Sequence, residues 1–232
     1  MFGLIVHGEL QCAIDFQHYN LSSDSIVVLS PRQVHKFLSE SGIEAFMLLV
    51  NPDIMTDNLR KLFDEIDLLP SPVFEAGDYS DLKILLELIS RQENVSVGKK
   101  MVMAFIEMIA DKISNQISGQ LKVSGRKKEL MFGFRNLLRE NITRERRPAY
   151  YSDRLNISTV YLNEIVNSLS GYSVSQYIKN EIILMAKREL YYSEDSIKAI
   201  ASKLGFDDSA YFTRLFTETV GIAPTEFRKN LV

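Results

Sequence analysis

Short hydrogen-bonding side chains recur on one face of two segments, 158–169 and 208–220, which we interpret as helices. The outward positions are Thr159, Val160, Asn163 and Glu164 in the first segment, and Ser209, Ala210, Thr213 and Arg214 in the second. Side chains of this kind pair with base edges: arginine with guanine O6 and N7, asparagine with adenine, and glutamate with cytosine N4. The chemistry predicted here is recognition of DNA bases, although a solvated helix face would explain the same polarity.

Both segments belong to a sequence repeat. Tyr161–Val166 recurs as Tyr211–Phe216, and a glycine follows each copy, at Gly171 and Gly221, so that the offset is 50 throughout. Self-similarity at a fixed offset indicates a repeated structural unit. The second helix of each copy is expected to bury one apolar stripe: Leu162, Ile165, Val166 and Leu169 in the first copy, and Tyr211, Phe212, Leu215, Phe216 and Val220 in the second.

Each copy predicts a helix, a short turn and a second helix. The turns contain Asn156 and Gly205, residue types that tolerate a left-handed backbone. A capping residue then begins each second helix: Ser158 in the first copy and Asp207 or Asp208 in the second. This is the helix-turn-helix plan, in which the second helix enters the major groove. The first helices are expected at 149–155 and 196–204.

A single helix is predicted between the two copies, over 173–192, where the chain has no glycine or proline. A helix of this length spans roughly 30 Å. Adjacent major-groove faces on one side of B-DNA recur about every 34 Å. One rigid helix could therefore hold both reading helices over successive turns of one duplex.

The C-terminal part resembles the AraC family of transcription regulators. The resemblance is carried by Ser196–Ala201, Leu204–Phe206, Tyr211–Phe216, Gly221–Pro224 and Phe227–Arg228, in order and spacing. It implies an all-helical DNA-binding domain of two helix-turn-helix units joined by a long helix. The family's base-contacting positions fall on residues already named: Val160, Asn163 and Glu164, then Ser209, Ala210, Thr213 and Arg214. Glu164 departs from many relatives, which have an arginine there.

The sequence of the first half of the chain predicts a sheet followed by helices. Strands are expected at 2–7, 11–16, 25–30 and 44–50, and helices at 55–66, 81–91 and 99–117, with a turn at 92–98. The predicted organisation is a sensing and dimerisation domain over 1–119, with a partial barrel over about 1–52 and helices over about 53–119. A linker over 120–126 and a DNA-binding domain over 127–232 follow. The apolar stripes of the helices within 81–117 would pack inside the chain or form a homodimer seam.

This half is similar to the cupin-like sensing domain of the same family, through Gly8, Asp15 and Pro31–Phe37. In the family several more strands, about 40–50 residues, precede this point, which implies a partial antiparallel β-barrel with an open edge. The expected fold class is therefore α+β: a partial barrel with helices, then an all-α domain. The resemblance implies double-stranded DNA, a small-molecule effector, a second copy of the chain and RNA polymerase as partners.

Composition narrows the class of protein. The chain has 232 residues, 46% hydrophobic, with one cysteine and a net charge of −3. Residues 126–232 carry a net charge of +4 and residues 1–125 one of −7, a split typical of a polyanion-binding half joined to an acidic half. No signal peptide, membrane span or internal disulfide is expected, which favours the cytoplasm. Cys12 is interpreted as a buried structural thiol rather than a redox sensor.

Other chemistry is weakly indicated. His7, His18 and His35 lack close metal-ligand spacing, and no phosphate loop or nucleophile motif occurs, so no metal, cofactor or catalytic residue is expected. The arginines Arg144, Arg146 and Arg147 would be either a solvated helix end or contacts to DNA phosphates. Two alternatives remain: a cupin-type ligand-binding protein or enzyme with a helical interaction tail, and a regulator whose barrel senses nothing and only supports a dimer.

Overall fold

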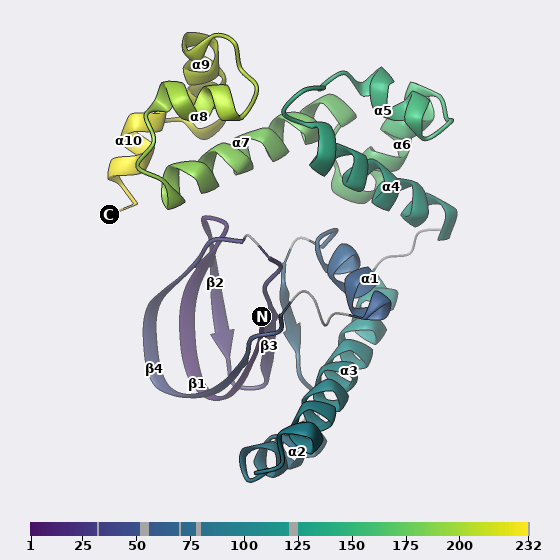
Figure 1. Cartoon of the computed structure of the whole chain (residues 1–232), viewed down its shortest axis with the longest axis vertical. Coiled ribbons are helices and arrows are strands. Elements are labelled where there is room, and N and C mark those ends of the chain that lie inside the picture. Colours follow the sequence, from purple (N-terminus) through teal and green to yellow (C-terminus); the bar gives the residue numbers. More distant parts are fainter. Residues whose placement is uncertain (32, 52–55, 70, 78–79, 121–124, 232) are drawn as a thin grey trace. The chain divides into compact units, whose positions relative to one another are not determined.

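The structure is a computed structural model that describes residues 1–231 except 32, 52–55, 70, 78–79 and 121–124. The chain divides into two compact units, an N-terminal unit over 1–122 and a C-terminal unit over 123–232 (Figure 1). The first combines a curled antiparallel sheet with helices, and the described part of the second is helical. The predicted α+β class is therefore confirmed.

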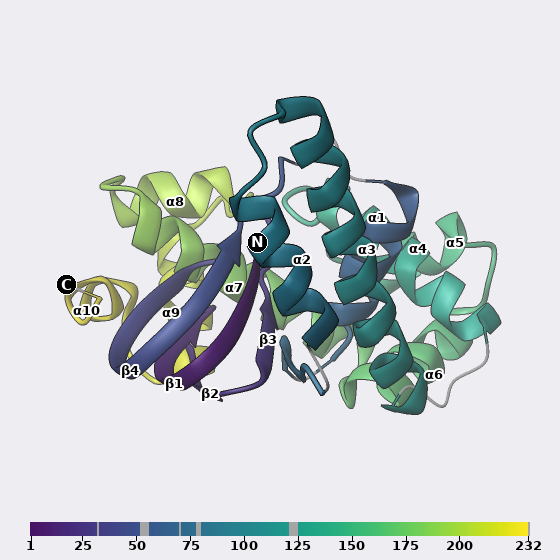
Figure 2. The same ribbon diagram turned by 90° about the horizontal axis from the view of Figure 1, so that it is seen from below.

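The sheet of the N-terminal unit is organised around its first strand. Its strands are β1 (Phe2–Ile14), β2 (Gln17–Ser22), β3 (Ser25–Val28), β4 (His35–Leu48) and β5 (Val73–Glu75). On one side β1 pairs with β4 along nearly its whole length, and on the other it pairs with β3 and then β2. β5 extends the sheet beyond β3. Figure 2 shows that β1, β2 and β4 curl together, as expected for part of a barrel.

The first strand joins two strands that the sequence predicts separately, 2–7 and 11–16. Gly8 interrupts the apolar pattern but does not end the strand, because it forms a bulge there with a φ of +85°. A Cβ at Gly8 would meet the backbone of Ser41 and Gly42 on β4, so only glycine allows this close approach. β2 is not predicted by the sequence, and β4 begins nine residues before the expected 44–50 strand.

Three helices follow the barrel strands: α1 (Asp57–Ile66), α2 (Ser80–Ser90) and α3 (Val95–Gln120). They agree with the helices predicted at 55–66, 81–91 and 99–117, although residue 55 lies outside the described residues. The prediction of helix alone over 53–119 is wrong at β5, where Val73–Glu75 pairs with β3. α3 also begins inside the predicted turn, because the Asn94 side chain accepts hydrogen bonds from the N–H groups of Ser96 and Val97 and so caps the helix.

Apolar side chains cover both faces of the sheet. One face contributes Phe2, Leu4 and Val6 to a core shared with the helices, and the stripes of α2 and α3 pack into that core through Leu82, Phe105 and others. The other face forms a second cluster that includes Cys12. Cys12 is 3% exposed, and burial raises the pKa of its thiol, as expected for an unreactive structural cysteine.

The C-terminal unit is built on one long helix. Its helices are α4 (Gly125–Asn141), α5 (Pro148–Arg154), α6 (Thr159–Ser170), α7 (Val174–Tyr192), α8 (Ile197–Lys203), α9 (Ser209–Val220) and α10 (Pro224–Lys229). α7, green in Figure 1, runs between α4–α6 at one end and α8–α10 at the other, and contacts α6, α8, α9 and α10. Of the predicted linker 120–126, α3 includes residue 120 and α4 begins at Gly125, and residues 121–124 lie outside the described residues.

Candidate nucleic-acid interface

Two helix-turn-helix arrangements lie in the C-terminal unit, formed by α5 with α6 and by α8 with α9. The turns have a left-handed residue at the predicted places, Asn156 with φ +53° and Gly205 with φ +78°. The Oγ atom of Ser158 accepts the Tyr161 N–H at 3.1 Å, and Oδ1 of Asp208 accepts the Ala210 N–H at 2.8 Å. The sequence left Asp207 and Asp208 as alternatives, and Asp208 is the capping residue.

Both second helices bury an apolar stripe. Leu162, Ile165 and Val166 are buried on α6, as are Phe212 and Phe216 on α9, and the outer members Leu169, Leu215 and Val220 are half-buried. The inward prediction is wrong for Tyr211, which is 47% exposed. Phe206 of the turn packs against the buried Phe212 with ring centroids 5.2 Å apart, and its ring lies 6.1 Å from that of Tyr211.

The outward face of α6 carries all four predicted residues, Thr159, Val160, Asn163 and Glu164, and all are exposed. Two of them are held in place. The Thr159 hydroxyl lies 2.8 Å from the buried Ser152 hydroxyl, and Oδ1 of Asn163 accepts the Val174 N–H at 3.0 Å. Together with Val174 and two neighbours, the four side chains line a shallow, open hollow.

The outward face of α9 differs in chemistry. Ala210 and Arg214 are exposed, whereas Ser209 and Thr213 are half-buried. The Thr213 hydroxyl donates to the Ser209 carbonyl at 2.9 Å, so it is engaged within its own helix. The guanidinium carbon of Arg214 lies 5.6 Å from the centroid of the exposed Tyr211 ring. Sequence reasoning missed Tyr211 as part of this face, and the aromatic Phe206 in the preceding turn was the available signal.

The three arginines before α5 have different surroundings. Arg144 is exposed. Arg147 is exposed too and forms an ion pair with Glu145 at 2.6 Å, and hydrogen bonds from Arg147 lower the pKa of Glu145 to about 2. Arg146 is half-buried and packs on the Phe206 ring at 3.9 Å. The Arg147 guanidinium is therefore engaged by Glu145 and the Arg146 guanidinium is used inside the unit, and a phosphate contact by these arginines stays a prediction.

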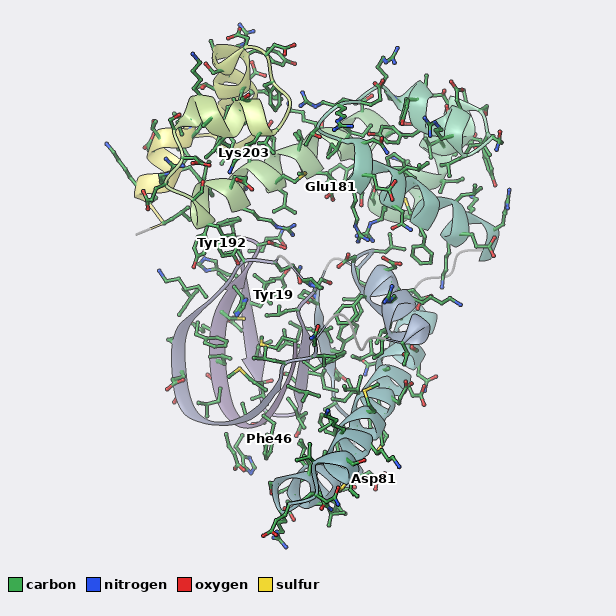
Figure 3. The ribbon with its side chains drawn as sticks, viewed as in Figure 1. Tyr19, Phe46, Asp81, Glu181, Tyr192 and Lys203 are labelled. Atoms are coloured by element: carbon green, nitrogen blue, oxygen red, sulfur yellow. The ribbon has the colours of Figure 1, made fainter. Side chains whose placement is uncertain are left out.

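The second helix-turn-helix is fixed to the C-terminal end of α7 by polar contacts. Lys203 Nζ lies 2.6 Å from a carboxylate oxygen of Asp195 and 3.3 Å from one of Glu189, and Figure 3 shows its side chain between α8 and α7. Arg228 of α10 donates to the Asp195 carbonyl at 2.8 Å. These contacts, added to the buried Phe216 and Phe227, hold α8–α10 on α7.

Other candidate chemistry is not concentrated anywhere in the described residues. His7, His18 and His35 are all exposed. Among the residues that the structure describes, no group of three or more His, Cys, Asp or Glu side chains is arranged to hold a metal ion. Within the same residues, every helix is too short or too polar to cross a membrane.

Known families match both parts of the chain. A helix-turn-helix domain model matches residues 151–230, and the model of the AraC-like ligand binding domain matches residues 1–94. The chain belongs to the AraC family of transcription regulators. The predicted function, a DNA-binding regulator with an N-terminal ligand-binding domain, is confirmed at this level, and the helical part is a DNA-binding domain rather than a general interaction tail.

Individual relatives agree with this membership. The transcriptional activator RhaS of Escherichia fergusonii is 22% identical over 98% of this AraC-family chain and 84% of its own length. The activator RhaR of Yersinia pseudotuberculosis is 34% identical over 31% of this chain and 24% of its own length. Among solved structures, an apo variant of ToxT from Vibrio cholerae has a TM-score of 0.54 and 18% identity, and the match covers 100% of this chain and 89% of ToxT. ToxT thus has the same fold.

Proposed function

We propose that α6 and α9 read bases in adjacent major grooves of one DNA duplex, held at a fixed separation by α7. The observation that supports this is the pair of capped helices with exposed outward faces, both packed on the same long helix. α7 has 19 residues, which corresponds to about 28 Å. That length is close to the repeat of about 34 Å between adjacent major-groove faces.

The contacts proposed for the bases follow the side-chain chemistry. Arg214 presents a planar guanidinium suited to guanine O6 and N7, and the neighbouring Tyr211 ring restricts its orientation. Asn163 uses one lone pair of Oδ1 for Val174 and keeps its NH2 group for a base. Glu164 would accept from cytosine N4. Thr159, Val160, Ser209, Ala210 and Thr213 complete the proposed contact surface.

The N-terminal unit is proposed to bind a small-molecule effector and to form a homodimer. Because the apolar stripes of α2 and α3 pack inside the unit, the dimer contact must use other side chains of these helices. Ile84 and Leu88 lie four residues apart on α2 and are 57% and 51% exposed, so they share one outer face. We propose this face as the centre of an isologous contact.

The biological setting follows from the relatives. RhaS and RhaR are named activators, so we propose that this chain also activates transcription, through a contact with RNA polymerase. We further propose that it works in the cytoplasm and without catalysis, metal or cofactor.

The dimer proposal is tested by Leu88→Glu, which should shift the sedimentation coefficient to that of a monomer, whereas the exposed Lys99→Glu should not. A monomeric wild-type chain would contradict it.

DNA binding is tested with the duplex that the full chain selects from a random-sequence library. Affinity, measured by fluorescence anisotropy, should fall steeply with salt because phosphate contacts release counterions. Arg214→Ala should cost about 1–3 kcal/mol, mostly at one base position. The matched control is Lys229→Ala, which removes an exposed positive charge from α10 in the same unit. Equal losses for the two variants would contradict the placement of Arg214 on a base.

A further inference from the structure

A second connection joins the two helix-turn-helix arrangements besides α7. The loop 142–147, which leads from α4 to α5, meets the turn between α8 and α9. Nη2 of Arg146 donates to the Leu204 carbonyl at 2.5 Å and to the Gly205 carbonyl at 3.2 Å. Its guanidinium also stacks on the Phe206 ring at 3.9 Å. One side chain from the loop before α5 therefore contacts three consecutive residues of the turn between α8 and α9.

The loop that carries Arg146 is itself fixed in the first arrangement. The Glu145 carboxylate accepts the backbone N–H groups of Arg146 and Arg147, each at 3.0 Å. The Tyr151 hydroxyl of α5 donates to the Glu145 carbonyl at 2.5 Å. Nε of Arg146 donates to the Ile142 carbonyl at 3.2 Å. The guanidinium thus projects from a braced support, and a movement of α5 would be passed on to it.

The turn that Arg146 contacts is tightly constrained at Gly205. Gly205 has a φ of +78° and lies so close to the Thr143 carbonyl that a Cβ would overlap with it. Phe206, under the guanidinium, packs on Phe212 and lies 6.1 Å from the Tyr211 ring. Both of these aromatics belong to the reading helix α9. The orientation of α9 is therefore tied to the loop before α5, and not only to α7.

We infer that Arg146 is a positioning residue that sets the spacing and rotation between the two reading helices. It thereby makes the regulator selective for the distance between its two half-sites, the stretches of DNA that α6 and α9 contact. This inference rests on the proposed function, in which α6 and α9 contact one duplex. Arginine suits the role because its planar guanidinium donates in a fork and stacks on a ring at the same time, which lysine cannot do.

Spacing is a sensitive readout because DNA couples distance to rotation. Inserting one base pair moves a half-site by about 3.4 Å and turns it by about a tenth of a helical turn. A rigid pair of reading helices cannot follow this change and loses contacts at one half-site. A pair that is joined by α7 alone can tilt and recover some of them.

The test compares full-length Arg146→Ala with the wild type and with Arg144→Ala. Arg144 lies in the same loop and is exposed, so its removal matches the loss of charge without the contact to the turn. The probes are the selected duplex and versions with one base pair inserted or deleted between its half-sites. Wild type and Arg144→Ala should lose about tenfold in affinity on each altered duplex, a loss comparable to a mismatched base pair. Arg146→Ala should lose less than about threefold, from a weaker starting affinity, and Arg146→Lys should lie in between.

The outcomes separate the inference from the proposed function. If Arg146→Ala weakens binding equally on all duplexes, with circular dichroism unchanged, Arg146 supports only affinity and the inference is wrong. If Arg144→Ala flattens the spacing profile as much, loss of charge explains the result and the inference is wrong as well. If scrambling either half-site has no effect on wild-type binding, it is the two-helix function itself that fails.

Discussion

The first and second helix-turn-helix arrangements share one plan and differ in how they present it. The reading face of α6 has an acid, Glu164, and an amide, Asn163, whose oxygen is already engaged by the Val174 N–H. The reading face of α9 has an exposed arginine beside an exposed tyrosine. Position 224, which matches Val174 in the repeat, is a proline without an N–H, so Thr213 has no such backbone group to bind and turns back to its own helix.

The two arrangements therefore share a fold but present different side-chain chemistry on their outward faces. An arginine contributes both a bidentate base contact and a positive charge near the phosphates, whereas a glutamate contributes repulsion from them. We therefore expect α9 to supply most of the affinity and α6 to supply orientation and selectivity.

The largest effect is expected at the turns. Gly205→Ala should lower the free energy of unfolding by about 2–4 kcal/mol. The alanine must keep the left-handed backbone of this position, and its Cβ overlaps with the Thr143 carbonyl. Asn156→Ala carries only the backbone cost, about 1 kcal/mol. Urea unfolding of the full chain measures both. Equal losses for the two variants would mean that the two turns are equally constrained, which would contradict the difference that we describe between the two arrangements.

A smaller effect is expected at Asn163. Asn163→Ala removes the hydrogen bond to the Val174 N–H and should cost about 1 kcal/mol in unfolding free energy. The matched change in the second arrangement, Thr213→Ala, breaks only a bond within one helix and should cost less than about 0.5 kcal/mol. A larger loss for Thr213→Ala in the same urea measurement would reverse our interpretation of the two helices.

The last effect appears only at alkaline pH and distinguishes the first arrangement from the second. Burial raises the pKa of Tyr151 from 10.0 to about 12, whereas the matching residue in the second arrangement is Ile200. The unfolded tyrosine ionises at lower pH than the folded one, so its contribution to stability is present below pH 10 and is lost as pH rises toward 12. The urea midpoint should fall less across this interval for Tyr151→Phe than for wild type or for Tyr172→Phe, a change at an exposed tyrosine. An equal fall in urea midpoint for Tyr151→Phe and wild type would contradict the raised pKa of Tyr151.

Much of the C-terminal unit follows from local chemistry. Ser158 and Asp208 cap helices, and Asn156 and Gly205 turn the chain, by interactions within a few residues. The sequence pattern therefore predicted Ser158 and both turn residues, and limited the cap of α9 to Asp207 or Asp208. Their faces could be assigned by helical periodicity except at Tyr211, which is 47% exposed. Phe206, from the turn before the helix, packs on Phe212 instead, with its ring 6.1 Å from that of Tyr211.

Contacts between distant residues were not predictable in the same way. Arg146 reaches Leu204, 58 residues along the chain, and nothing in the local pattern of 144–147 separates it from its two neighbours. β5 pairs with β3 across almost fifty residues, so a three-residue strand with only two apolar residues did not stand out between helices. Gly8 is a comparable case, since its bulge depends on β4 passing beside it.

The central claim, that α9 carries most of the affinity, is tested most directly by scrambling each half-site of the selected duplex in turn and measuring binding of wild type and Arg214→Ala by anisotropy. When scrambling one half-site makes wild type and Arg214→Ala bind equally well, that half-site is the one that α9 contacts. We predict that scrambling this half-site weakens wild-type binding at least about tenfold more than scrambling the other. Equal losses at the two half-sites, or a greater loss at the site of α6, would contradict the account.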